Sequence, residues 1–254
     1  MELHLIHFLI VCPFVFLAGL VDAIGGGGGL ISLPAYLIAG VPIHMSIATN
    51  KLSSCCGTML ATGRFIKNKM INFKIGIPSV IAAVIGSSIG AKLSLVADEK
   101  ILQIVLLVAL PVTAFFVLNK KLFPEIEEHD LNLNDPKLYV VVCISALIIG
   151  MYDGFYGPGT GTFLIIAFTL IGKMDMKKAN SQAKLINLTT NLTSLVVFAL
   201  SGQVVVLLGI AAALCNMLGA YIGAGLAMNK GSKIIRPCII LVLGLLFLKV
   251  LGVY

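Results

Sequence analysis

The chain has 254 residues, of which 59% are hydrophobic and only 11% are charged, and its mean hydropathy is +1.05. A water-soluble domain carries about a quarter of charged residues, so this composition excludes a soluble globular protein. The net charge of +7 does not indicate a nucleic-acid partner. The basic residues lie in short loops, where positive charge sets the orientation of a membrane protein in the lipid bilayer.

The apolar runs are about twenty residues long, which predicts an all-α polytopic membrane protein rather than the short alternating strands of a β-barrel. The first run lacks the basic start and the small-residue cleavage site of a signal peptide, so we expect it to be retained. In chain order, the expected segments are 4–22, 29–40, 46–63, 75–96, 101–118, 138–155, 160–172, 179–200, 203–226 and 236–252.

Two copies of one pattern follow each other along the chain. "GLVDAIGGGGG" from Gly19 resembles "GMYDGFYGPGT" from Gly150, and "GSSIGAKL" from Gly86 resembles "GAYIGAGL" from Gly219. The offset between the copies grows from 131 to 133 residues. The four-residue glycine spacing in the second pair of motifs predicts close helix packing. We therefore expect a single transmembrane domain with a first repeat over 1–118, a cytoplasmic connection over 119–137 and a second repeat over 138–254.

The charges of matching loops predict that the two copies face in opposite directions. The loop "RFIKNKMINFK" is basic and its counterpart "LSGQV" is uncharged, whereas "GVPIHM" has no Lys or Arg and its counterpart "GKMDMKK" is basic. By the positive-inside rule this is an inverted-topology repeat, which five segments per copy allow, and both termini lie outside the cytoplasm. Inverted repeats with broken helices are typical of secondary transporters.

Each copy has a glycine-rich stretch before a short apolar segment. We expect Gly25–Gly29 to be unwound and extended, so that it crosses the membrane together with a half-helix from near Leu30, and Tyr156–Gly161 to do the same before Thr162. Two half-helix N-termini would offer N–H groups and partial positive charge to an anion, whereas close helix packing is the competing explanation. The candidate substrate contacts in these stretches are Gly26, Gly27, Gly28, Gly29, Gly157, Gly159, Thr160 and Gly161.

Two lysines occupy matching positions early in the third segment of each copy. They are Lys51, beside Asn50, and Lys184, close to Gln182, and all four residues are candidates for substrate binding. A lysine inside a membrane is costly and is therefore a functional candidate, although a lysine near a loop can also extend to the interface. A buried lysine at this position would attract a negatively charged substrate.

Two aspartates, Asp22 and Asp153, precede the glycine-rich stretches. They could carry protons that couple transport to a gradient, cap the half-helices, or pair with the lysines. No Walker motif, zinc-ligand triad or catalytic serine pattern occurs in the chain. The sequence therefore predicts no enzyme activity, no metal site and no cofactor.

At these motifs the chain resembles the TauE/SafE (TSUP) family of sulfite and organosulfonate exporters. The resemblance covers essentially the whole chain and is carried by "GLVDAIGGGGGLISLPAYLIAGVPIHMSIATNKLSS", "GFYGPGTGTFLIIAFTLIG" and "KKANSQAKLINLTTNL". It implies a permease of the bacterial inner membrane that moves sulfite, a sulfonate, sulfoacetate or thiosulfate, driven by an ion gradient. The assembly state is open, with a homodimer as one alternative.

Two other functions compete with an alternating-access transporter. A membrane thiol–disulfide carrier would use Cys12, Cys55 or Cys56, but no cysteine recurs at the equivalent position of the other copy. Such a carrier would also leave the matched glycine stretches unexplained. An anion channel would share the predicted site but would show neither saturation nor dependence on a proton gradient.

Overall fold

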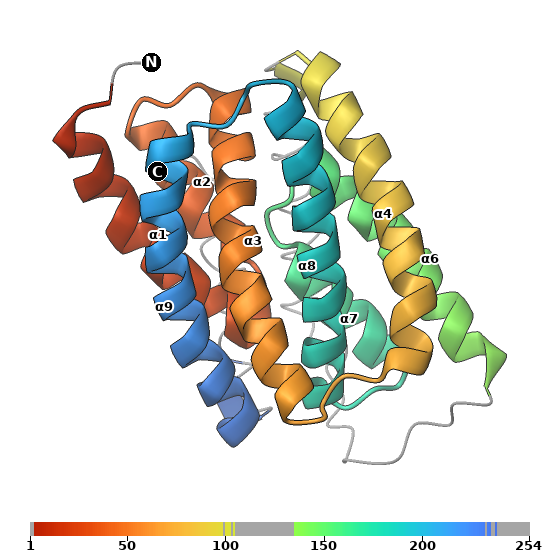
Figure 1. Ribbon diagram of the computed structural model, residues 1–254. Coiled ribbons are helices and arrows are strands. Elements are labelled where there is room, and N and C mark those ends of the chain that lie inside the picture. The colour runs from red at the N-terminus through yellow and green to blue at the C-terminus, as the bar shows by residue number, and fades with distance from the viewer. Residues whose placement is uncertain are drawn as a thin grey trace.

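The computed structural model describes residues 3–98, 100–102, 104, 135–231, 233, 234 and 237. All regular secondary structure in this part of the chain is helical, which confirms the all-α membrane fold (Figure 1). Nearly all of the predicted segments 101–118 and 236–252, and of the connection 119–137, lies outside the described residues. The helices are α1 (Leu5–Gly25), α2 (Gly29–Ile38), α3 (Ile43–Lys67), α4 (Phe73–Val96), α6 (Pro136–Phe155), α7 (Thr160–Leu170), α8 (Met176–Leu200) and α9 (Val206–Lys230).

Helices α1, α4, α6, α8 and α9 are long and apolar enough to cross a membrane. Their outward faces carry large exposed apolar side chains, such as Ile77 on α4, Ile148 on α6 and Leu214 on α9. The buried side chains of α3 and α8, by contrast, include many polar residues. Apolar residues outside and polar residues inside are the arrangement expected of a multi-pass protein whose solvent is lipid.

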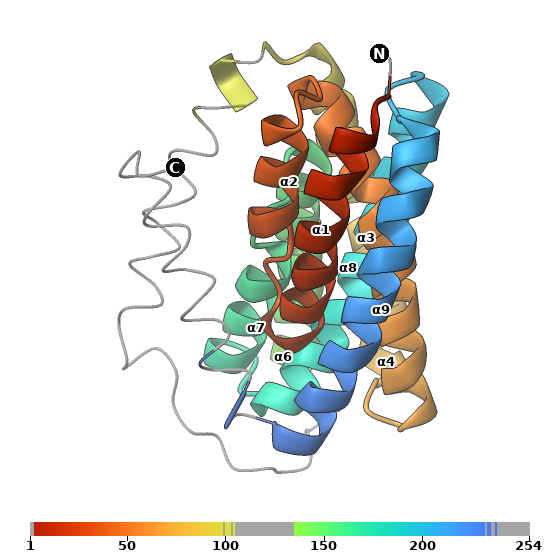
Figure 2. The ribbon, with the colours of Figure 1, turned by 90° about the vertical axis from the view of Figure 1, so that its left-hand side faces the viewer.

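Helices α1 and α2 form a hairpin, which corrects the expectation of an extended glycine stretch that crosses the membrane with its half-helix. Helix α1 continues to Gly25 and α2 begins at Gly29, so only Gly26–Gly28 are non-helical. The end of α2 returns to the first half of α1, where Tyr36 and Val11 share one hydrophobic cluster (Figure 2). The reason is local: Gly26 and Gly27 have φ values of +74° and +94°, which reverse the chain instead of extending it.

The second copy has the same kind of break between a long and a short helix. Only Tyr156–Gly159 separate α6 from α7, so the non-helical stretch is again shorter than predicted. Gly157 and Gly159 have φ values of +101° and +86° there. The prediction of a short helix after each glycine-rich stretch is confirmed.

The two copies pack against each other through the glycine pairs. Helix α4 packs on α6, and α9 packs on α1. A Cβ atom on Gly86 would lie 2.2 Å from the carbonyl oxygen of Leu147, and one on Gly219 would lie 2.0 Å from that of Phe16. These contacts confirm that the glycines let two helix backbones touch.

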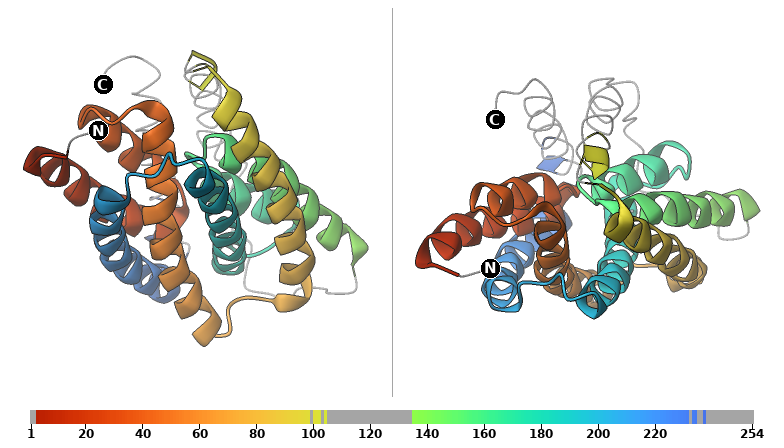
Figure 3. Two further views of the ribbon diagram at one scale, coloured as in Figure 1. Left: turned by 45° about the horizontal axis from the view of Figure 1, so that its top comes forward. Right: turned by 90° about the horizontal axis from the view of Figure 1, so that it is seen from above.

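Helices α3 and α8 lie next to each other in the middle of the bundle and run in opposite directions (Figure 3). The N–H of Asn72, the N-cap of α4 at the end of the loop after α3, donates to Gln182 Oε1 near the start of α8, at 3.3 Å. At the other end, the N–H of Val205 donates to Thr49 Oγ1 near the start of α3, at 3.0 Å. The two bonds join positions that match in the two copies, so this contact is reciprocal.

Candidate functional site

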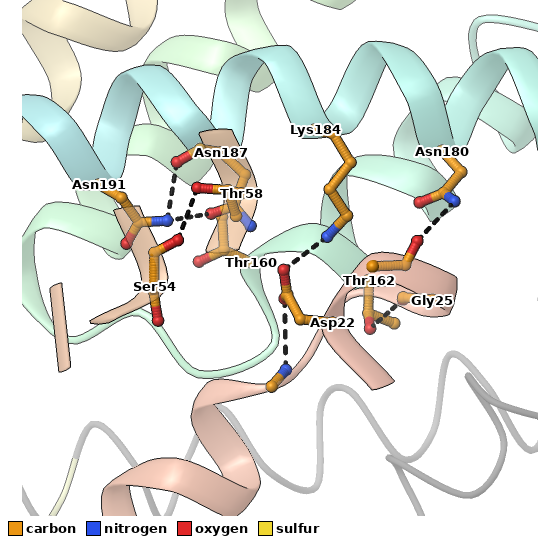
Figure 4. Close-up of polar contacts among 12 residues, drawn as sticks. Asp22, Gly25, Ser54, Thr58, Thr160, Thr162, Asn180, Lys184, Asn187 and Asn191 are labelled. Atoms are coloured by element: carbon orange, nitrogen blue, oxygen red, sulfur yellow. Dashed lines mark hydrogen bonds and ion pairs between the residues drawn. The ribbon is translucent and has the colours of Figure 1, made fainter. Parts of the chain in front are cut away.

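The two glycine-rich breaks touch each other. A Cβ atom on Gly26 would lie 2.2 Å from the backbone nitrogen of Thr162, and one on Gly161 would lie 2.7 Å from the Cα of Gly26. The hydroxyl of Thr162 donates to the carbonyl of Gly25 at 2.9 Å (Figure 4). Any larger side chain at Gly26 would separate the two backbones, so glycine is required at this position for steric reasons.

Around this contact, each lysine pairs with the aspartate of the other copy. Lys51 Nζ of α3 lies 3.0 Å from Asp153 Oδ2 of α6, and their side chains are 2% and 3% exposed. Lys184 Nζ of α8 lies 2.8 Å from Asp22 Oδ2 of α1, with exposures of 0% and 18% (Figure 4). Both lysines are therefore inside the protein rather than at the membrane interface, and each has a counter-ion.

The second oxygen of each aspartate binds the start of the short helix in its own copy. Asp22 Oδ1 accepts from the N–H of Gly28, the N-cap of α2, at 3.3 Å. Asp153 Oδ1 accepts from the hydroxyl of Thr160, the first residue of α7, at 2.7 Å. Of the roles left open by the sequence, capping and lysine pairing are thus both present. The carboxylates occupy the helix N-termini where an anion would be stabilised.

A small polar cavity of about 20 Å³ lies between the two ion pairs. It has room for about one water molecule, so a sulfur oxyanion with several oxygens does not fit without movement of its walls. Nine of the predicted site residues besides Asp22 line it: Gly27, Gly29, Asn50, Lys51, Asp153, Gly157, Gly159, Thr160 and Gly161.

Three other cavity residues were not among the predicted substrate contacts, namely Ser54, Asn187 and Asn191. Ser54 and Asn187 each follow the lysine of their helix by three residues, so they lie on the same helix face. Asn191 Nδ2 donates to the carbonyl and to Oδ1 of Asn187 at 2.8 and 2.9 Å (Figure 4). Helical spacing from the lysines is the signal that would have found all three.

Gln182 lies elsewhere, although it precedes Lys184 by only two residues. It lines a larger, open cavity of about 720 Å³ beside the loops after α3 and α7 and the end of α9. Two residues turn a helix by about 200°, which points Gln182 away from the ion pairs. Lys69, Lys177 and Lys178 line the same cavity.

Gly26, Gly28 and Lys184 contact the site without lining the small cavity, Lys184 through its ion pair with Asp22. Gly26 and Gly28 do so through their backbones, Gly26 against Gly161 and Gly28 through its bond to Asp22. Asn50 Oδ1 accepts from the hydroxyl of Ser32 at 2.6 Å, which joins α2 to α3. Within the described part of the chain, no cluster of three His, Cys, Asp or Glu side chains could hold a metal ion.

A multi-pass helical protein with paired charges buried at two helix breaks has the features of a membrane transporter. The chain belongs to the family described as "Sulfite exporter TauE/SafE", whose model matches residues 11–250. It is 34% identical to "Probable membrane transporter protein YfcA" of Escherichia coli, over 92% of this chain and 86% of that protein. It is 33% identical to "Probable membrane transporter protein ORF9" of Sinorhizobium sp, over 94% and 89%. No solved structure matches the chain significantly.

Proposed function

We propose that this protein is a secondary transporter that moves a small sulfur-containing anion across the bacterial inner membrane by alternating access. The candidate anions are sulfite, a sulfonate, sulfoacetate and thiosulfate. The family description and the bacterial relatives support the class of substrate and the membrane. The observation that carries the proposal is the pair of crossed ion pairs at the contact between the two helix breaks.

In the proposed cycle, the aspartates occupy the anion positions until they are displaced. Each carboxylate binds a buried lysine and a helix start, which are the two groups that would bind a substrate anion. Protonation of Asp22 or Asp153 would neutralise the carboxylate and leave the lysine without a counter-ion. An unpaired buried charge costs about 3–5 kcal/mol, and an incoming anion would offset this cost. Proton binding and anion binding would therefore favour each other, which couples transport to a proton gradient.

Alternating access would come from movement of the two copies relative to each other. The reciprocal contacts of α4 with α6, of α9 with α1 and of α3 with α8 support an inverted repeat with an approximate two-fold axis. The larger cavity opens beside the basic loops, which by the positive-inside rule face the cytoplasm. With this orientation both termini lie outside the cytoplasm.

The first test identifies the anion and the role of the lysines. Purified protein is screened by thermal shift against sulfite, sulfate, thiosulfate and sulfonates, because a ligand that binds the folded state raises its melting temperature. Flux of the best ligand is then measured in proteoliposomes for Lys51→Ala and Lys184→Ala, and we expect both to be strongly slowed. Wild-type flux in both folded variants would remove the lysines from the mechanism.

The second test concerns coupling. Asp22→Asn and Asp153→Asn should each abolish accumulation against a gradient while downhill flux continues, because asparagine cannot take up and release the proton. Accumulation at the wild-type level in both variants would exclude these carboxylates as coupling groups.

A further inference from the structure

Helices α3 and α9 lie side by side (Figure 1), and a groove lies on the outer surface between them, lined by none of the residues of the ion pairs. Its volume is about 340 Å³, and most of its lining is apolar, including Met59 and Leu60 of α3 and Met217 of α9. Two cations, Arg64 and Lys67, lie at one end. We call this feature the α3–α9 groove.

The groove has the length of one membrane leaflet. Along α3 its lining extends from Cys56 to Lys67, a rise of roughly 16 Å at about 1.5 Å per residue. This is about half of the roughly 30 Å hydrocarbon core. The cations lie in the last turn of α3, next to the basic loop that follows it. The uncharged part of this lining, from Cys56 to Gly63, accounts for about 10 Å of the rise, and the positive charge lies beyond it, at the expected depth of the lipid headgroups.

Gly63 makes part of the space in this groove. Apart from the adjacent residues and the nearby backbone of α3 itself, no described atom lies within 4 Å of the position of a Cβ atom at Gly63, whereas one on Gly57 of the same helix would overlap Asn216 Oδ1 at 1.7 Å. Gly57 is thus explained by close packing against α9, but Gly63 is not. Glycine is a poor helix former, and at Gly63 the described part of the chain offers no packing contact that accounts for it, so its effect there is to leave space in the groove.

Arg64 is held at the end of the groove. Its guanidinium carbon lies 4.1 Å from the ring centroid of Tyr221, and its Nη1 donates to the carbonyl of Tyr221. A Cβ atom on Gly225 would lie only 3.1 Å from this nitrogen, so glycine there leaves room for the guanidinium. Guanidinium has five N–H donors in a planar fork that suits phosphate, and donors besides Nη1 remain for a ligand.

The second copy of the repeat has no such cations. The positions of α8 that match Gly63, Arg64 and Lys67 are Val196, Val197 and Leu200. The charged groove is therefore not a by-product of the repeat. It lies at the end of the bundle where the loops are basic.

We propose that the α3–α9 groove binds an anionic glycerophospholipid. One acyl chain lies along α3 past Leu60 and Gly63, and the phosphate is bound by Arg64 and Lys67. Basic residues at the ends of membrane helices attract anionic headgroups, and the apolar channel beside them gives the chain a defined place. This site is separate from the proposed transport site, and its test does not depend on the transported anion.

The role of the positive charges of Arg64 and Lys67 is tested with lipids as the probe. The protein is equilibrated with equal amounts of phosphatidylglycerol and phosphatidylcholine, and bound lipid is counted by native mass spectrometry. We expect the wild type to retain phosphatidylglycerol preferentially and Arg64→Gln/Lys67→Gln to lose this preference roughly tenfold or more. Lys230→Gln, which removes a charge from the end of α9 outside the groove, is the control and should keep it. An unchanged preference in the double variant, or an equal loss in the control, would overturn the proposal.

The apolar channel is tested separately. Gly63→Leu fills the groove without changing charge and should lower retention of both lipids, while Val196→Leu at the matching position of α8 should not. Unchanged retention in Gly63→Leu would overturn the proposal, as would a protein dimer that this variant dissociates. If the double charge variant does not fold, Lys67→Gln alone decides the charge arm, because Lys67 is exposed and its loss leaves Arg64 in place.

Discussion

The ion pair between Lys51 and Asp153 gives the sharpest prediction about stability. At 3.0 Å, two unit charges attract by about 5–6 kcal/mol for an effective dielectric constant of about 20. Both side chains are almost fully buried, so removing one partner leaves the other charge unpaired, at a cost of about 3–5 kcal/mol. Removing both replaces the pair by neutral groups and should cost much less. We therefore expect Lys51→Met and Asp153→Asn each to destabilise strongly and the double variant to recover most of the loss.

The assay is thermal unfolding in detergent, followed with a thiol-reactive fluorophore. The chain has no tryptophan, but Cys55 is buried and becomes reactive when the protein unfolds. A loss of about 3–5 kcal/mol should lower the melting temperature of a chain of this size by roughly 6–20 °C. The double variant should melt within a few degrees of the wild type. Melting temperatures that fall additively would refute the argument, because the coupling energy would then be close to zero.

The ion pair between Lys184 and Asp22 can be compared directly with the pair between Lys51 and Asp153. Its distance is similar, but the Asp22 side chain is 18% exposed and the Asp153 side chain only 3%. Water can therefore partly solvate the Asp22 carboxylate when its lysine is removed. We expect Lys184→Met to be less destabilising than Lys51→Met, and an equal or larger loss would contradict this explanation.

Three further outcomes are expected. Sulfite or another transported anion should raise the melting temperature of Asp153→Asn more than that of the Lys51→Met/Asp153→Asn double variant, since only the first has an unpaired lysine for the anion. Gly26→Ala should lose transport and about 1–3 kcal/mol or more of stability, because the added Cβ atom overlaps Thr162. Gly202→Ala is the control: Gly202 also has positive φ but borders open space, so this variant should lose only about 1 kcal/mol. Replacing all six cysteines by serine or alanine should leave flux intact, and loss of flux in a folded variant would favour a thiol–disulfide carrier.

The sequence predicted the two helix breaks because glycine runs interrupt apolar segments at matching positions. It did not predict the hairpin between α1 and α2, because glycine adopts positive and negative φ about equally and the sequence does not show which one occurs. Gly26 and Gly27 reverse the chain only because both have positive φ. An extended glycine stretch and a half-helix are together long enough to cross the membrane, so the number of residues allowed the predicted crossing. The prediction was nevertheless wrong, because the chain turns back at Gly26 and Gly27.

The sequence also identified the four charged residues and left lysine–aspartate pairing open as one of their roles, but it did not predict which lysine pairs with which aspartate. The alignment of the two copies matches Lys51 with Lys184 and Asp22 with Asp153. It shows which residues are equivalent in sequence but not which residues are in contact. The crossed pairs arise because the two breaks touch, and this is a tertiary contact between Gly26 and Gly161. Gln182 was grouped with Lys184 by closeness in sequence, although the helical turn separates the faces on which they lie.

The crossing of the ion pairs bears directly on the proposed mechanism. If each lysine paired with the aspartate of its own copy, exchange of a carboxylate for a substrate anion would leave the contact between the copies unchanged. Because Lys51 and Lys184 each bind the aspartate of the other copy, every such exchange also removes a bond that holds the two copies together. Substrate binding and relative movement of the copies would then be linked through the same two bonds.

Asp22 is more exposed than Asp153, so it would be the first of the two carboxylates to meet a proton from solution. We therefore expect Asp22→Asn to alter the pH dependence of transport more than Asp153→Asn does. The measurement is the initial flux over a pH series. Equal changes in the two variants would show that the difference in exposure has no part in coupling.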